Sequence, residues 1–290
     1  MCVVLVTGAT GFVGVQASAA LERRGATVRS VSSAQDLLDP DSRRRVVEDA
    51  GATHLLHLAW VTQHGQFWSD PRNLDWAVAS LDLARLFAAS GGTRLVFGGS
   101  CAEYDWSAAD SPLDELTSTR GPASLYGTAK LATGDLLQGW SRVAGVSVAR
   151  GLLFFLYGPG EQPGRLVPGV IRRLLAGERV AVTDGTQVRD FLHVEDAGEA
   201  LAALTLSDVT GPVNIASGSG HRVADLASIL AELAGRPDLL DLGALPRPVN
   251  DPQALVARTA LLDERVGRPA PRDLRAGLIE TMAWWREGRR

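Results

Sequence analysis

Tyr126 and Lys130 are the two residues of the chain whose types and spacing best suit proton transfer. Residues four apart in a helix lie on one face, so the phenol and the ammonium can be directed at one point. A phenol titrates near pH about 10 in water. A fixed cation beside it favours the phenolate and lowers its pKa. We therefore expect Tyr126 to donate or accept a proton with Lys130 as its partner.

The composition of the chain draws further attention to Lys130. It is the only lysine among the 29 basic residues, all others being arginine, and one of only three tyrosines lies four positions before it. Lysine is a compact charge whose position and pKa can be tuned, whereas arginine is a planar group that stays protonated. The spacing alone is common on surface helices, but its coincidence with the single lysine favours a functional pair.

A glycine-rich segment, residues 7–14, follows the first apolar run of the chain and precedes a helical pattern. Glycines allow a tight turn and a close approach to a pyrophosphate, which the free amides of a helix N-terminus attract. The alternative is an ordinary turn, but the position between a strand and a helix favours a dinucleotide site. The residues expected to contact the cofactor are Gly8, Thr10, Gly11, Phe12, Val13 and Gly14.

The residues after the second predicted strand bear on the choice of cofactor. An acidic residue there would bind the adenosine ribose and repel a 2′-phosphate. Ser32 and Ser33 occupy these positions, and the next carboxylate is that of Asp36. Small hydroxyl groups tolerate a phosphate and can hydrogen-bond to it, so the sequence favours NADPH over NADH.

Strands that alternate with helices are expected to position these groups. The pattern predicts a doubly wound parallel α/β sheet, with helices on both faces. The expected strands are residues 2–7, 27–32, 54–59, 94–98 and 146–156, and the expected helices are residues 11–24, 41–50, 73–90, 124–142 and 165–176, with short strands at 180–182 and 212–215.

The chain changes in texture after Tyr157, where glycine, proline and short strands become frequent. We expect residues 1–157 to form the dinucleotide-binding domain, with 187–206 returning to it. Residues 158–186 and 207–290 are expected to form a smaller α/β lobe that binds the substrate at the carboxyl edge of the sheet. Ser100 ends the fourth strand at that edge, where ligands bind in such folds, so its hydroxyl can steady a substrate oxygen beside Tyr126.

Composition excludes several classes of function. A formal net charge of -4 argues against a nucleic-acid or anionic-membrane partner. No apolar run is long enough to span a bilayer, and the first residues lack the charged lead of a signal peptide, so we expect a cytoplasmic protein. The two cysteines, Cys2 and Cys101, form neither a disulfide framework nor a metal spacing, and no metal site is expected.

Together these motifs resemble the extended short-chain dehydrogenase/reductase family of the NAD-dependent epimerase/dehydratase type, which has a Rossmann fold and acts on nucleotide sugars. The resemblance covers essentially the whole chain, and includes His57-Leu58-Ala59, Tyr157-Gly158-Pro159-Gly160 and residues 187–196. It implies that Ser100, Tyr126 and Lys130 form the catalytic triad, and it implies a homodimer. The resemblance also implies adenine contacts from Asp36 and Leu37, cofactor contacts from Leu58, Ala59, Tyr126 and Lys130, and substrate contacts from Ser100, Cys101 and Arg189, with Arg165 and Arg247 as weaker candidates for the diphosphate.

Departures from the family pattern narrow the expected reaction. Sugar 4,6-dehydratases carry an Asp-Glu pair where Cys101 and Ala102 stand, and reductases that also epimerise carbons 3 and 5 use a cysteine and a histidine where Ala102 and Gly160 stand. Phe155 replaces an asparagine that touches the sugar in many relatives.

The residues that remain suit hydride and proton transfer and no further reaction. We expect NAD(P)H-dependent reduction of the 4-keto group of an NDP-4-keto-6-deoxyhexose, with dTDP as the favoured nucleotide. The alternatives are a nucleotide-sugar 4-epimerase that keeps its NAD, and a non-catalytic NADP-sensing regulator. The presence of both Tyr126 and Lys130 counts against the regulator.

Overall fold

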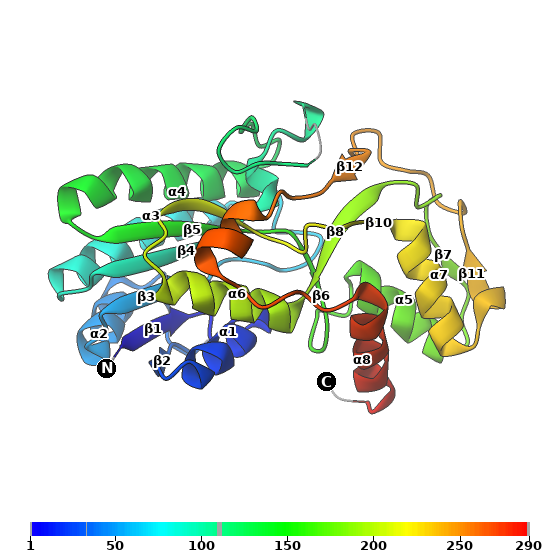
Figure 1. Cartoon of the computed structure of the whole chain (residues 1–290), viewed down its shortest axis with the longest axis horizontal. Helices are drawn as coiled ribbons and strands as arrows, with labels where there is room; N and C mark the ends of the chain where they lie inside the picture. Colours follow the sequence, from blue (N-terminus) through cyan, green and yellow to red (C-terminus); the bar gives the residue numbers. More distant parts are fainter. Residues whose placement is uncertain (1, 33, 109–111, 289–290) are drawn as a thin grey trace.

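A six-stranded parallel sheet forms the larger part of the molecule in the computed structural model, which describes residues 2–32, 34–108 and 112–288 (Figure 1). The strand order is β2-β1-β3-β4-β5-β9, and every neighbouring pair is parallel. The strands are β1 (Val3–Thr7), β2 (Thr27–Ser30), β3 (His54–His57), β4 (Arg94–Ser100), β5 (Ser147–Leu153) and β9 (Gly211–Ile215).

Helices cover both faces of this sheet. On one face α1 (Phe12–Arg23) and α6 (Val194–Leu206) share an apolar core with the strands. On the other face a second core joins the strands to α2 (Pro40–Ala50), α3 (Arg72–Ala89) and α4 (Leu125–Ala144). The predicted doubly wound α/β fold of the Rossmann type is therefore confirmed.

A smaller lobe with its own core lies beside the sheet, at the right of Figure 1. Its central strand β8 (Val188–His193) pairs in parallel with β6 (Phe155–Tyr157) and β12 (Ala254–Leu255), and antiparallel with β10 (Gly220–Arg222). The other elements of the lobe are α5 (Leu166–Leu175), β7 (Val180–Ala181), α7 (Val223–Ala234), β11 (Leu240–Asp241) and α8 (Leu274–Arg286). Elsewhere along the chain, short helical segments are η1 (Cys101–Glu103), η2 (Trp106–Ala108), η3 (Pro237–Leu239) and η4 (Leu262–Val266).

The chain leaves the main sheet earlier than the sequence predicted. The expected strand at 146–156 is two strands, because the chain changes partners at Phe154: its amide still bonds to Ile215 of the main sheet, whereas β6 pairs with β8. The segment that returns to the main sheet also differs from the one expected in the division between domain and lobe. β9, which falls in the stretch assigned to the lobe, pairs with β5 in the main sheet, while β8 belongs to the sheet of the lobe.

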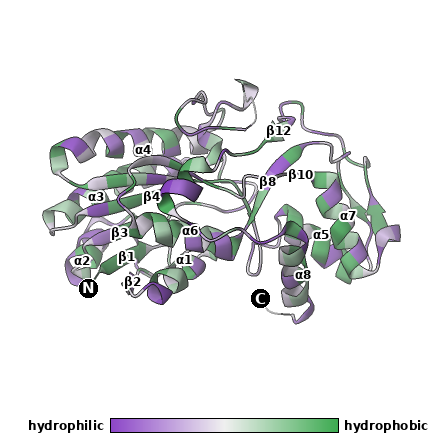
Figure 2. Ribbon diagram, viewed as in Figure 1, coloured by the Kyte–Doolittle hydropathy of each residue, from purple (hydrophilic) through white to green (hydrophobic). Residues whose placement is uncertain are grey.

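Local signals in the sequence define the helix that carries Tyr126 and Lys130. The Ser124 hydroxyl caps the start of α4 by accepting from the Gly127 amide at 3.1 Å. Gly145 ends the helix in the left-handed conformation, with φ 68°. Figure 2 shows hydrophobic and hydrophilic residues in alternation along α4, which covers the sheet on one side and meets solvent on the other.

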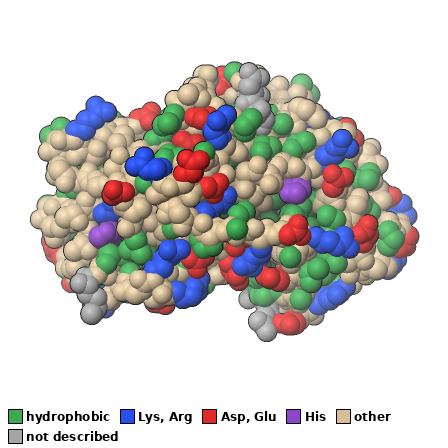
Figure 3. All heavy atoms as spheres, viewed as in Figure 1, with side chains coloured by type: hydrophobic (Ala, Val, Ile, Leu, Met, Phe, Trp, Pro, Cys, Tyr) green, Lys and Arg blue, Asp and Glu red, His purple; other side chains and the backbone are tan. Residues whose placement is uncertain are grey.

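Surface features are those of an ordinary globular chain. On the face drawn in Figure 3, basic side chains are interspersed with acidic ones and do not gather into one basic patch. Among the described residues, no helix has both the length and the apolar character needed to cross a bilayer.

Gly198 of α6 offers a test of how closely the helices on one face of the sheet are packed. A Cβ at this position would lie 2.7 Å from the backbone carbon of Gln16 in α1, so the two helices have no room for a methyl group. We predict that Gly198→Ala lowers the free energy of unfolding by about 1–3 kcal/mol, the usual cost of overpacking. Urea denaturation followed by circular dichroism measures it.

Gly139→Ala is the matched control. Gly139 lies within α4, and nothing stands within 4 Å of the position of its Cβ. The higher helix propensity of alanine should stabilise this variant by about 0.5–1 kcal/mol. If both variants changed stability in the same direction, the close contact between α1 and α6 would not be the cause.

Candidate active site

Ser100 ends β4 at the carboxyl edge of the sheet and begins the short helix η1. Its hydroxyl oxygen accepts from the Ala102 amide at 3.2 Å, and its own amide donates to the Glu103 carboxylate at 2.9 Å. The two bonds form a capping box, which fixes the serine in one orientation. The hydroxyl hydrogen remains available to donate to a ligand.

A buried ion pair supports this turn from behind. Glu103 is fully buried, and its Oε2 lies 3.0 Å from the Arg150 guanidinium of β5, with Arg120 at 4.0 Å. Burial raises the pKa of Glu103, while Arg150 and the Ser100 amide favour the charged form. The turn that presents Ser100 therefore depends on a carboxylate held by arginine inside the protein.

Tyr126 lies in the first turn of α4 and faces Ser100. The Ser100 hydroxyl lies close enough to the phenol to lower its pKa, so the structure brings together two of the three residues predicted to form the triad. The contact depends on Gly127, because a Cβ there would lie 2.3 Å from the Ala102 carbonyl oxygen. The start of α4 thus rests directly on the backbone of η1.

Lys130 is not among the main causes that set the pKa of Tyr126, which differs from the expectation from the sequence. Burial raises the pKa of Tyr126 to about 12, and Arg165, not Lys130, is the cation that opposes this rise. The reason is where the ammonium lies: its nitrogen is 6.0 Å from the centre of the Tyr126 ring and donates to the Gly98 carbonyl at 2.7 Å. At neutral pH the Tyr126 phenol is therefore protonated.

Lys130 itself is almost completely buried, with 3% of its surface exposed. Burial lowers the pKa of its ammonium to about 7, and the Glu103 carboxylate acts in the opposite direction. The nitrogen lies 3.9 Å from the centre of the Trp60 ring and 4.7 Å from that of Phe97. Lys130 is thus held by aromatic faces and one carbonyl rather than by a carboxylate in direct contact.

Aromatic side chains form a wall around Tyr126, which we call the aromatic wall: Phe67, Trp68 and Trp106. The Tyr126 ring meets Phe67 and Trp68 edge to face, at 4.9 Å and 5.7 Å between centroids. Trp106 contacts Trp68 at 6.0 Å and donates from its indole nitrogen to the Cys101 carbonyl. A ligand beside Tyr126 therefore meets mainly apolar faces.

The glycine segment has the form that a dinucleotide requires. Gly8 has φ 70°, and a Cβ there would lie 2.8 Å from the Ala59 nitrogen; one on Gly14 would lie 2.0 Å from the Gly8 oxygen. Gly11 caps α1 without any side-chain hydrogen bond, and the first turn has no acidic residue. The amides at this helix start are free to bind phosphate, so the loop at Gly8, Thr10, Gly11, Phe12, Val13 and Gly14 fits a pyrophosphate.

A chain of hydrogen bonds fixes the second wall of this loop. The Ser80 hydroxyl donates to the Trp76 carbonyl, so it must accept from His57 Nε2, 2.8 Å away. His57 Nδ1 then accepts from the Thr7 hydroxyl at 2.6 Å, and Thr7 accepts from the Ala59 amide at 3.2 Å. Burial lowers the pKa of His57 to about 3, so the imidazole stays neutral and holds Leu58 and Ala59 beside the glycines.

The residues expected at the adenosine end are only partly free for a ligand. Ser32 donates from its amide and hydroxyl to the Gln35 side chain, and Ser33 lies outside the described residues. The Asp36 carboxylate is exposed but accepts from the Leu38 amide at 2.9 Å, and Leu37 is buried in the core.

The three predicted substrate arginines occupy two places. Arg189 is buried, lies 5.6 Å from the Phe155 ring centre and is near enough to Cys101 to oppose the burial that raises its thiol pKa to about 12. Arg189 and Arg247 both pair with the Asp251 carboxylate. The cysteine is therefore a thiol at neutral pH, and the two arginines form one charged group with their shared carboxylate.

Arg165 lies on the other side, next to the aromatic wall. Its guanidinium is 5.1 Å from the Phe67 ring centre, and it also opposes the burial that raises the pKa of Glu161 to about 8. From Arg165 an open pocket of about 530 Å³ extends into the lobe. Its lining includes Arg165, Arg172, Arg173, Val180, Val182 and Leu245.

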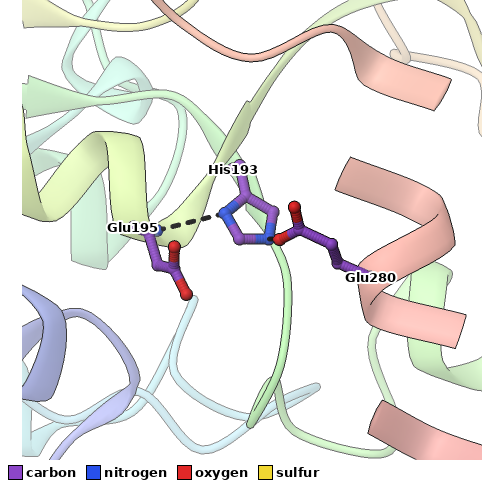
Figure 4. Close-up of side chains that lie close together, drawn as sticks. All are labelled: His193, Glu195 and Glu280. Atoms are coloured by element: carbon purple, nitrogen blue, oxygen red, sulfur yellow. Dashed lines mark hydrogen bonds and ion pairs between the residues drawn. The ribbon is translucent and has the colours of Figure 1, made fainter. Parts of the chain in front are cut away.

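One cluster in the described part of the chain has donor atoms within reach of a single metal ion: His193, Glu195 and Glu280 (Figure 4). The close-up shows the imidazole between the two acidic residues, with Nε2 3.9 Å from the Glu280 carboxylate. Arg272 already pairs with Glu195 at 2.9 Å and with Glu280 at 2.7 Å. Arg272 is therefore the cation that the structure places against both carboxylates.

Sequence reasoning missed three residues that shape the site: Glu103, Arg150 and Trp60. A signal for Glu103 was present, because Ser100-x-x-Glu103 is the pattern of a capping box. Arg150 comes from β5 and Trp60 from the segment after β3, and neither gave such a signal. Their roles depend on contacts through space.

Comparisons with known proteins identify the family of the chain. The sequence profile of the NAD dependent epimerase/dehydratase family matches residues 4–216. UDP-glucuronate 4-epimerase 3 of Arabidopsis thaliana is 28% identical, over 97% of this chain and 76% of its own length. A dTDP-4-dehydro-6-deoxy-D-allose reductase of Streptomyces is 32% identical over 45% of this chain and 41% of its own. The structure of MoeE5 in complex with UDP-glucuronic acid and NAD superimposes with a TM-score of 0.82 at 28% identity, covering 98% of this chain and 99% of that one.

Gly127→Ala tests whether the contact between α4 and η1 sets the geometry of Ser100 and Tyr126. The methyl group must push the start of α4 away from the Ala102 carbonyl. A displacement of about 1 Å typically costs about 10²-fold in rate, so we predict a loss of that order in kcat with little change in cofactor binding. Steady-state kinetics and a cofactor titration measure the two effects. Gly139→Ala, on the same helix, should retain full activity, and equal kcat values for both variants would contradict this account.

Proposed function

Since the chain belongs to the NAD dependent epimerase/dehydratase family, we propose that it is a nucleotide-sugar ketoreductase. In this proposal a reduced nicotinamide supplies hydride to carbon 4 of an NDP-4-keto-6-deoxyhexose, with dTDP as the favoured nucleotide. Tyr126 donates a proton to the keto oxygen at carbon 4, and Ser100 hydrogen-bonds to that oxygen. Lys130 binds the ribose of the cofactor beside the tyrosine.

The observation that carries the proposal is the placement of the Tyr126 phenol close to Ser100 and against the aromatic wall. With a pKa of about 12, the phenol is protonated at neutral pH. A protonated phenol can give a proton to the oxygen of a ketone that accepts hydride.

The cofactor loop supports a dinucleotide, and the end of β2 favours NADPH. The glycine cradle and the uncapped start of α1 would hold the pyrophosphate, while Leu58 and Ala59 line the loop. The amide and hydroxyl of Ser32 face Gln35 rather than an acid, so no carboxylate at this position would repel a 2′-phosphate. MoeE5, by comparison, was solved with NAD.

Arginines of the lobe suit a diphosphate. Arg165 links the surroundings of Tyr126 to a pocket whose rim also carries Arg172 and Arg173, and Arg189 and Arg247 lie together around Asp251. Guanidinium groups bind phosphate oxygens in a forked geometry. A nucleotide in the pocket would therefore place its sugar towards Tyr126.

A 4-epimerase is the second candidate, because relatives similar over nearly the whole chain are UDP-sugar 4-epimerases. Such an enzyme would keep its cofactor and return the hydride to the other face of the sugar. The reductase among the relatives matches less than half of the chain but at higher identity.

The exposed apolar residues of α3 and α4 lead us to propose a homodimer. Leu74 and Val78 of α3, and Leu136 and Val143 of α4, are each more than half exposed. A second copy of the chain would cover this face, as exposed apolar patches commonly mark interfaces.

The decisive assay supplies a dTDP-4-keto-6-deoxyhexose with NADPH or with NADH and follows the nicotinamide absorbance. We predict one mole of cofactor oxidised per mole of sugar reduced, with the higher kcat/KM for NADPH. Tyr126→Phe should lower kcat by about 10²–10⁴-fold while cofactor binding survives. Interconversion of UDP-hexose 4-epimers without net cofactor oxidation would replace the reductase by the epimerase.

Light scattering after size-exclusion chromatography tests the dimer. The wild type should elute at about twice the 30.7 kDa mass of the chain. The double variant Val78→Glu, Leu136→Glu should elute as a monomer, because two charges on each copy would lose hydration in the interface. Val249→Glu, at an exposed position of the lobe, should stay dimeric. A monomeric wild type would refute the proposal.

A further inference from the structure

Trp60 directly follows Leu58 and Ala59 and contacts the only lysine of the chain. The Lys130 nitrogen lies over its indole face at 3.9 Å from the ring centre. Phe97 lies on a further side at 4.7 Å, and the Gly98 carbonyl accepts the ammonium hydrogen at 2.7 Å. We call these three groups, from Trp60, Phe97 and Gly98, the ammonium seat.

Trp60 is held firmly enough to define a position. Its indole nitrogen donates to the Asn73 side chain at 2.7 Å, and Asn73 in turn donates to the Phe67 and Asp70 carbonyls at 2.8 Å. Asn73 has no exposed surface. The hydrogen bonds leave the ring no freedom to turn away from Lys130.

The charged and titratable groups around Lys130 do not take over the role of the ammonium seat as its partner. Glu103 of η1 raises the pKa of Lys130, but that carboxylate is paired with Arg150. His57 of β3 is neutral, and Tyr126 of α4 is protonated at neutral pH. After the Gly98 carbonyl, the nearest favourable electrostatic partners of the ammonium are therefore the ring faces, whose quadrupoles attract a cation strongly where water is excluded.

We propose that Trp60 is a positioning residue for Lys130: its indole face holds the buried ammonium in its charged form and fixes the point from which it acts. This inference rests on the proposed role of Lys130 in the reaction. It explains why a compact cation stands here in a chain that otherwise uses arginine, since a guanidinium would bring five donors to a seat with one carbonyl acceptor.

The single lysine allows a direct test. Protein labelled with [ε-¹³C]lysine gives one side-chain signal, whose chemical shift against pH reports the protonation of Lys130 alone. We predict that Trp60→Leu lowers the midpoint of this titration by about one pH unit, a tenfold weaker hold on the proton. Trp60→Phe, which keeps an aromatic face, should titrate between the wild type and Trp60→Leu.

Trp76→Leu is the matched control. Trp76 packs against Trp60 with 6.3 Å between ring centroids and is not part of the ammonium seat. This variant should titrate as the wild type does. If Trp60→Leu does not give folded protein, a titration midpoint of Trp60→Phe below that of the wild type supports the proposal. Equal midpoints in the wild type and in the folded Trp60 variants would overturn the proposal.

Kinetics give an independent reading. Because the ammonium is present below its pKa and lost above it, kcat/KM should fall as pH rises through the titration of Lys130. The fall should move to lower pH in Trp60→Leu by the same amount as the carbon signal. The carbon titration needs no substrate, so it can succeed or fail separately from the reductase assay.

Discussion

The ion pair between Glu103 and Arg150 is the interaction on which the candidate site depends. The guanidinium lies 3.0 Å from a carboxylate with no exposed surface, so neither charge could stay inside the protein without the other. The pair needs space, and two glycines provide it. A Cβ on Gly99 would lie 2.5 Å from the Glu103 carboxylate, and one on Gly134 would lie 2.3 Å from the Arg150 guanidinium. Through one ion pair β4, β5 and α4 are therefore held in a single register, and that register sets Tyr126 against Ser100.

The two kinds of cation in the chain serve different purposes in this arrangement. Arginines take positions where several acceptors or a carboxylate are at hand, as Arg150 does with Glu103 and Asp135. Lys130 takes a position with one carbonyl and two aromatic faces. The composition alone pointed to Lys130, but the physical reason for its type lies in the space between Trp60 and Phe97. That space admits a compact ammonium group. It lacks the several acceptors that a planar guanidinium would need.

The sequence was a good guide to elements and motifs, and a poor guide to contacts between them. Alternating strands and helices and the glycines of residues 7–14 were local signals, and each gave the structure seen. The change of sheet at Phe154 gave no local signal, because an apolar run reads alike in either sheet. The pKa of Tyr126 was misjudged for a similar reason. Spacing placed Lys130 on the right helix face, but burial of the phenol and the bond of the ammonium to Gly98 decide the outcome.

Reduction and 4-epimerisation place the same demands on Ser100 and Tyr126, so the difference must come from what surrounds the sugar. A sugar whose carbon 4 reaches the Tyr126 hydroxyl has the aromatic wall on one side. Each hydroxyl group that loses water against such faces without a partner costs about 1–3 kcal/mol. A methyl group at carbon 6 incurs no such cost and gains from leaving water. An epimerase must also hold the sugar in two orientations, which requires polar partners for its hydroxyl groups in each. The apolar surroundings of Tyr126 are therefore in keeping with the proposed function, in which a deoxysugar binds in one orientation and leaves reduced.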